Sequence, residues 1–134
     1  MILVAGLGCR KDCGADELLA LLRTCLREAG LDETLLTALA SSEAKQLEGG
    51  LRELARQLRL PLELLPAERL TPYENRLSST SELALRTTGS ASVAEASALA
   101  LAEALAEGPA RLVLTKRRSA NATCALAMAP YPLG

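Results

Sequence analysis

At residues 2–16 the chain reads ILVAGLGCRKDCGAD, and this stretch decides the fold. The apolar run at 2–5, closed by Gly6-Leu7-Gly8, is typical of a buried strand that feeds a turn. A helix follows, with Asp16 as its predicted N-cap and Gly30 as its C-terminal stop. Its apolar residues recur at helical spacing, at Leu18, Leu19, Leu22, Cys25, Leu26 and Ala29. We therefore expect an amphipathic helix docked on a sheet.

The same alternation continues to residue 65. A second apolar run at 34–40 ends in two serines, and a second helix is predicted from about Ala44 to just before Pro61. A short third strand is predicted at 60–65. Strands that alternate with helices indicate a parallel sheet with right-handed crossovers.

The second half of the chain adds antiparallel pairing. Residues 66–89 are rich in Pro, Asn, Ser and Thr, with a short helix predicted at about 81–87. A strongly apolar helix at 92–107 is followed by a strand at 110–115, a basic and polar connection at 116–122 and a last strand at 123–129. Because that connection is short, these two strands should be antiparallel neighbours. We expect an α/β fold with a mixed sheet, in one domain over residues 1–134.

The composition excludes several classes of function. The chain has 134 residues, 49% of them hydrophobic, a net charge of -1, two Tyr, and no Phe, Trp or His. So few aromatic residues argue against a protein that stacks nucleic-acid bases, and the near-zero charge argues against general nucleic-acid binding. The lack of His excludes Ser-His-Asp and Cys-His catalysis and His-ligated metals. We expect no metal, and no cofactor, since Lys11 stands where a dinucleotide fingerprint needs its third glycine.

The cysteines and the apolar segments predict a cytoplasmic protein. Cys9, Cys13, Cys25 and Cys124 are too sparse and irregular for a disulfide scaffold or a zinc ribbon, so we expect free thiols in a reducing cytosol. The N-terminus lacks the features of a signal peptide, and the longest apolar stretch is too short to cross a bilayer. No membrane association is expected.

Two interpretations of the glycine-rich segment after the first strand remain open. Backbone amides near Gly8, with Arg10 and Lys11, suit an anion. A tight turn that needs glycine, with the basic side chains in solvent, suits the sequence equally well. Cys9 lies beside these cations near a helix start, where a thiolate is favoured, but without a histidine base a small buried thiol is the better interpretation.

A second candidate group follows the second predicted strand. Ser41 and Ser42 end that strand, and Lys45 and Glu48 begin the next helix. Ligands of open α/β sheets bind at the carboxyl ends of strands, so these side chains can face a ligand. Lys45 and Glu48 can also form a simple exposed pair one turn apart, and this interpretation carries more weight.

A third group precedes the helix at 92–107. Gly89 and the hydroxyls of Ser90 and Ser92 form a candidate anion site. Ser92 and Glu95 also have the spacing of a capping box, which would compete with a ligand for the same groups.

The fourth group is Lys116-Arg117-Arg118, with Thr123 nearby. Three consecutive cations between two strands usually form a solvated tip. If the strand at 110–115 runs parallel to the first strand, however, Lys116 lies at the same edge of the sheet as Gly8 and Arg10. The two interpretations are a solvated tip and a basic rim.

Four motifs in order resemble one family. They are G-L-G-C-R at 6–10, K-x-x-E-x-G-L at 45–51, G-x-x-x-V-A-E-A at 89–96 and L-V-L-T-K at 112–116. Together they resemble the cobalamin-biosynthesis family formed by CobE and the C-terminal domain of CbiG, the cobalt-precorrin-5A hydrolase. The resemblance covers essentially the whole chain, and the length is similar to free-standing CobE. The chain departs from the family pattern at Cys13, and at Ser90, where some members have Cys.

The resemblance implies a three-layer α/β/α sandwich with a mixed, mostly parallel sheet of about five strands. It also implies a role in corrin-ring assembly, with a polycarboxylate precorrin or corrinoid intermediate as the ligand and other cobalamin-pathway enzymes as candidate partners. Carried over by position, the candidate contacts are Gly8, Cys9, Arg10, Ser42, Lys45, Glu48, Gly89, Ser90, Ser92, Glu95, Lys116 and Thr123.

The reaction of the CbiG family suggests catalytic roles by analogy. That reaction opens a δ-lactone on the macrocycle and releases a two-carbon fragment. Lys45 or Lys116 would polarise the lactone carbonyl, and Glu48 or Glu95 would position water. Binding without catalysis is slightly favoured over hydrolysis, because the lactone chemistry can reside in a part of CbiG outside this region of similarity. A structural partner of other pathway enzymes is the third alternative.

Overall fold

The computed structural model describes residues 1–10, 12–43, 49–73 and 93–132. Its strands are β1 (Ile2–Cys9), β2 (Ala38–Ser42), β3 (Leu62–Leu65), β4 (Arg111–Arg118) and β5 (Ala122–Ala129). Its helices are α1 (Ala15–Ala29), the short 3₁₀ helix η1 (Glu33–Leu35), α2 (Gly49–Leu58) and α4 (Val93–Ala106), and residues 67–73 are also helical. In these ranges no helix has the length and apolar character needed to span a membrane.

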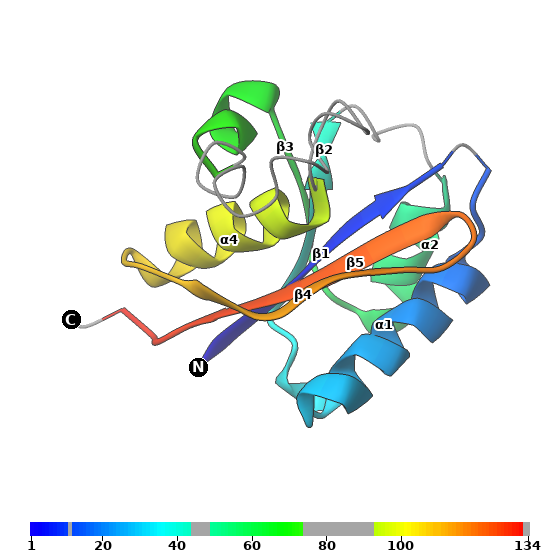
Figure 1. The fold of residues 1–134 in the computed structure, drawn as a ribbon, viewed down its shortest axis with the longest axis horizontal. Coiled ribbons are helices and arrows are strands. Elements are labelled where there is room, and N and C mark those ends of the chain that lie inside the picture. Colours follow the sequence, from blue (N-terminus) through cyan, green and yellow to red (C-terminus); the bar gives the residue numbers. More distant parts are fainter. Residues whose placement is uncertain (11, 44–48, 74–92, 133–134) are drawn as a thin grey trace.

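The strands form one mixed sheet in the order β3-β2-β1-β5-β4. β1 pairs in parallel with β2 and β2 with β3, whereas β5 is antiparallel to both β1 and β4. Four strands therefore run in one direction, and only β5 among the described strands is reversed. As Figure 1 shows, α1 and α2 cover one face of the sheet and α4 covers the other. This confirms the predicted three-layer α/β/α sandwich and its mostly parallel sheet.

Each face of the sheet has its own apolar core, as the alternation of β1 requires. On the α1–α2 face, large side chains such as Leu3, Leu7, Leu22 and Leu54 pack together. On the α4 face, Ile2 and Val4 meet a helix whose buried residues are mostly alanine. The α4 layer consequently lies close to the sheet.

Two predicted boundaries near the first strand were wrong. Gly6 and Gly8 were expected in a turn, but both lie inside β1, which pairs with β5 from Ile2 to Cys9. A Cβ added at Gly6 would lie 1.9 Å from the Ala94 carbonyl oxygen, so this glycine allows α4 to approach the strand. Asp16 lies within the first turn of α1, and the N-cap is Gly14.

Other elements differ at their ends. Residues 34–40 were predicted as one strand, but η1 occupies the start of that run and β2 ends at Ser42. β4 extends through Arg118, so the three cations lie in the strand and not at the hairpin tip. The helix stop at Gly30 is confirmed, since this residue adopts the left-handed conformation, with φ of 71°. The helix predicted at 81–87 lies outside the described residues, and the helical residues 67–73 were not anticipated.

Candidate functional site

Three strands bring Gly8, Thr123 and Arg118 into one row at the carboxyl edge of β1. Gly8 is paired with Thr123, and Thr123 is paired with Arg118. Residues paired across strands share a face. Gly8 lies two residues after Gly6 and four after Val4, so all three face α4. Thr123 Oγ1 lies 2.6 Å from the position that a Cβ on Gly8 would take. The row thus presents a hydroxyl and a guanidinium beside a position without a side chain.

Ser42 ends β2 at the same edge. Ala40 pairs with Gly6, so Ser42 is at the level of Gly8 on the neighbouring strand. Backbone pairing of β1 with β2 covers Val4 to Gly6, and beyond it the Ser41 hydroxyl donates to the Leu7 carbonyl at 2.6 Å. By alternation Ser41 faces the α1–α2 core and Ser42 faces α4.

Glu95 and Lys116 are brought together from α4 and β4. The backbone N–H of Lys116 donates to Oε2 of Glu95 at 2.9 Å. Glu95 is 9% exposed and lies in the first turn of α4, next to Ala94, which contacts β1 at Gly6. The prediction that Lys116 and Gly8 lie at the same edge of the sheet is therefore confirmed. We call Gly8, Ser42, Glu95, Lys116, Arg118 and Thr123 the carboxyl-edge cluster.

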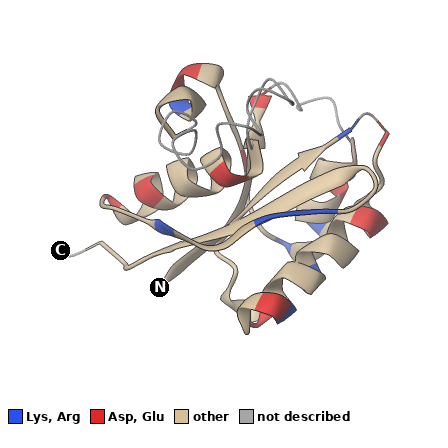
Figure 2. Cartoon of the chain, viewed as in Figure 1, with Lys and Arg blue, Asp and Glu red and all other residues tan. Residues whose placement is uncertain are grey.

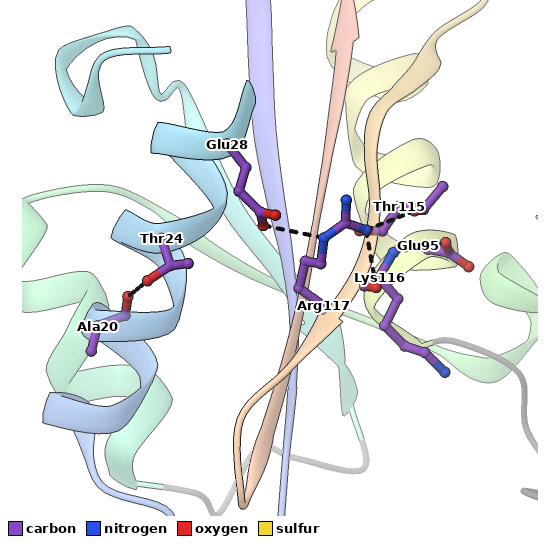
Figure 3. Close-up of polar contacts among 7 residues, drawn as sticks. All are labelled: Ala20, Thr24, Glu28, Glu95, Thr115, Lys116 and Arg117. Carbon is purple, nitrogen blue, oxygen red and sulfur yellow. Dashed lines mark hydrogen bonds and ion pairs between the residues drawn. The ribbon is translucent and has the colours of Figure 1, made fainter. Parts of the chain in front are cut away.

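The three consecutive cations of β4 do not all point to the same face of the sheet. Arg117 is paired with Cys124, on the α1 face, and its Nε donates to Oε2 of Glu28 at 3.1 Å. Figure 3 shows Arg117 reaching toward Glu28, whereas the Lys116 side chain extends in a different direction, on the side of Glu95. Arg118 returns to the α4 face by its pairing with Thr123. Figure 2 shows these basic residues on the edge strand of the sheet.

A carboxylate on α1 holds the hairpin that carries the cluster. Glu17 accepts hydrogen bonds from the Ser119 hydroxyl, from the Asn121 N–H at 2.7 Å and from Asn121 Nδ2 at 3.0 Å. The bond from Ser119 and the two from Asn121 lower the pKa of Glu17, because they stabilise its charged form. The Arg10 N–H donates to the Asn121 carbonyl at 2.8 Å, so the chain after β1 is tied to the same hairpin.

All four cysteines are free and buried, as predicted. Cys9 faces the α1–α2 core, on the side of β1 opposite Gly8, and is thus separated from the carboxyl-edge cluster. Cys25 and Cys124 are hydrogen-bonded to each other between α1 and β5, and this bond and burial raise the pKa of the Cys124 thiol. A protonated, buried Cys124 fits a packing role.

The predicted site residues thus fall into three groups. Gly8, Ser42, Glu95, Lys116 and Thr123 are gathered in the cluster, whereas Arg10 is exposed beyond the end of β1 and Cys9 lies in a core. The remaining five lie outside the described residues: Lys45, Glu48, Gly89, Ser90 and Ser92. Arg118 was missed as a site residue, because its place beside Thr123 depends on the pairing of β4 with β5, which the local sequence pattern does not display.

Comparisons with known proteins agree on one family. The family model described as "Cobalamin synthesis G C-terminus" matches residues 3–127. The curated protein CobE of a Sinorhizobium species is 35% identical over 125 residues, which are 93% of this chain and 79% of that protein.

Solved structures give the same result. A crystal structure of CobE, described as a protein from the cobalamin (vitamin B12) biosynthetic pathway, has a TM-score of 0.84 and 49% identity, over 94% of this chain and 92% of that one. The cobalamin biosynthesis protein chiG of Agrobacterium tumefaciens has a TM-score of 0.73 and 38% identity, over 94% and 97%. A putative cobalamin biosynthesis protein G homolog of Sulfolobus solfataricus, 22% identical with a TM-score of 0.67, shares the fold over 95% of this chain and 36% of its own length.

Proposed function

The chain belongs to the family of the C-terminal part of cobalamin synthesis protein G, and we propose that it binds a precorrin or corrinoid intermediate of corrin-ring assembly. The family places the chain among cobalamin-biosynthesis proteins. The finer proposal concerns the ligand and how it is held. Corrin-ring intermediates carry acetate and propionate side chains around a largely apolar macrocycle, so a binding protein needs cations beside an uncharged surface.

The observation that carries this proposal is the separation of the cations on β4. Lys116 and Arg118 are on the face of Gly8 and Thr123, whereas Arg117 is paired with Glu28 on the other face. Arg can bind a carboxylate through two N–H groups, and Lys adds a third donor group and a second charge. The hydroxyls of Thr123 and Ser42 can donate to further carboxylate oxygens. The ligand would thus be held by its carboxylate periphery.

The hydrolase alternative is less favoured by the position of Glu95. Its Oε2 accepts a hydrogen bond from the Lys116 backbone, and the side chain is 9% exposed. A general base must reach the attacking water, so a carboxylate engaged with the backbone is poorly placed for that role. Lys116 remains able to polarise a carbonyl, but the same side chain also suits carboxylate binding.

A titration with hydrogenobyrinic acid, a metal-free corrinoid acid, tests the proposal. We expect its visible spectrum to shift at micromolar protein while its mass stays unchanged. Lys116→Ala and Arg118→Ala should each raise Kd about threefold to tenfold, because each removes a charge-assisted contact. Arg117→Ala is the matched control on the same strand and should change Kd by less than about twofold.

The other outcomes discriminate between the alternatives. If a precorrin intermediate loses mass on incubation with the protein, the hydrolase alternative would be supported and binding without catalysis would be contradicted. No spectral response to either compound would contradict both and would leave a structural role toward other pathway enzymes. We also propose that the protein acts in the cytoplasm, in keeping with its four free thiols.

A further inference from the structure

The pairing of β4 with β5 has two register shifts, one between Leu112 and Leu114 and a second between Leu114 and Arg117, and the second lies next to the cations. Leu114 is paired with Leu126 and Arg117 with Cys124, so two residues of β4, Thr115 and Lys116, stand opposite Ala125 alone. Such a one-residue β-bulge reverses the face to which every later side chain points. The bulge therefore decides which cations reach the carboxyl-edge cluster.

With the first register shift kept, loss of the second shift alone would give the opposite arrangement. Counting on from Leu114 without a bulge, Lys116 would be paired with Cys124 and would face α1. Arg117 would then be paired with Thr123 and face α4, and Arg118 would face α1. The cluster would contain one cation of the three instead of two.

We infer that Glu95 is a positioning residue that holds this bulge and thereby selects a ligand with at least two carboxylates. Inside a bulge a backbone N–H can leave the regular ladder and needs another acceptor. The N–H of Lys116 finds that acceptor in Oε2 of Glu95, at 2.9 Å. Glu95 is itself fixed, because the adjacent Ala94 packs on β1 at Gly6.

The other glutamate of α4 offers a comparison within the same helix. Glu103 Oε2 accepts from the N–H of Ala110 at 2.9 Å, just before β4, and Oε1 accepts from the Tyr73 hydroxyl at 2.7 Å. The two carboxylates thus fasten the two ends of β4 to α4. Of these two glutamates, Glu95 is the one bonded within the bulge that precedes Arg117 and Arg118, so we expect Glu95 and not Glu103 to set their faces.

The binding consequence rests on the proposed function, whereas the structural consequence does not. The pairing can be followed by amide hydrogen exchange and by cross-strand nuclear Overhauser contacts, which join Arg117 to Cys124 in the structure described. Glu95→Ala should remove the protection of the Lys116 amide and the contacts from Arg117 to Cys124. Glu95→Gln retains an acceptor oxygen and should keep both.

Affinity for hydrogenobyrinic acid should follow the pairing. We expect Glu95→Ala to raise Kd about threefold to tenfold, since Lys116 and Arg118 leave the site and Arg117 alone enters it, and Glu95→Gln to stay within about twofold of the parent protein. Glu103→Ala is the matched control, since it loses a similar contact but should keep the bulge and the affinity. The a,c-diamide of hydrogenobyrinic acid, with fewer carboxylates, should lose less affinity in Glu95→Ala than the acid does.

Each result decides the inference. Unchanged pairing and Lys116 protection in Glu95→Ala would overturn it. If that variant does not fold, Glu95→Gln decides alone: lost affinity with intact pairing would assign Glu95 a direct role in the site and overturn the positioning role. If the parent protein binds no corrinoid, the proposed function fails, and the exchange experiment still tests whether Glu95 holds the bulge.

Discussion

The two faces of the sheet are built from different side chains. The α1–α2 face is filled by leucines from α1, α2 and the strands β1, β2, β4 and β5, and its largest side chains are fully buried. The α4 face is covered by a helix whose buried residues are mostly alanine. The backbone of this helix packs closely against β1 at Gly6. Polar side chains gather at the carboxyl edge of this second face. The difference indicates that one face mainly stabilises the fold and the other places the site.

The largest effect should come from the leucine face. Leu22 is fully buried between α1 and the sheet, so Leu22→Ala should lower the free energy of unfolding by about 2–5 kcal/mol. Urea unfolding followed by circular dichroism measures this change. A loss of less than about 1 kcal/mol would mean that this face collapses around the cavity or is not the stabilising one.

The α4 face should be sensitive to added volume instead. A Cβ at Gly6 would lie 1.9 Å from the Ala94 carbonyl oxygen, so Gly6→Ala must move α4 and should destabilise the protein by about 1–3 kcal/mol. Because α4 carries Glu95, hydrogenobyrinic acid should also bind more weakly. Gly108→Ala is the control, since its added Cβ would meet an atom only at 3.9 Å. Equal stability of the two variants would contradict this close approach.

The hairpin contact of Glu17 should give a smaller effect that depends on pH. Its pKa in the folded protein is lowered from 4.5, so its contribution to stability is present above that value and is lost as the pH falls through the folded-state pKa. Glu17→Gln should therefore unfold at lower urea than the parent protein at pH 7, and the difference should shrink below about pH 4.5. A difference that is constant from pH 7 to pH 3 would show that the charge of Glu17 has no part in it.

The smallest effect is expected for Arg117. Its ion pair with Glu28 joins side chains that are 38% and 44% exposed, and such pairs contribute about 0–1 kcal/mol. Arg117→Ala should change stability by no more than that, as urea unfolding would show. A larger loss would mean that the hydrogen bonds of Arg117 to Thr115 also hold the strand.

The sequence predicts the layers of this fold better than its site. Periodic leucines and the stop at Gly30 predict α1, and the apolar runs predict the strands, because both signals are local. The close approach of Ala94 to Gly6 depends on two segments far apart in the chain. The local pattern does not show it and predicts a turn at Gly6 and Gly8 instead of a strand. The hydrogen bond between Glu95 and the Lys116 backbone also joins two segments far apart in the chain, so the local pattern does not display it.

The central claim is that the ligand binds at the carboxyl edge of the α4 face. Amide chemical-shift mapping of the isotope-labelled protein, titrated with hydrogenobyrinic acid, tests it most directly. We predict that the largest shifts occur at Gly8, Lys116 and Thr123, with little change at Cys25 and Glu28 on the leucine face. Shifts that centre on α1, or no shifts at saturating ligand, would contradict the account.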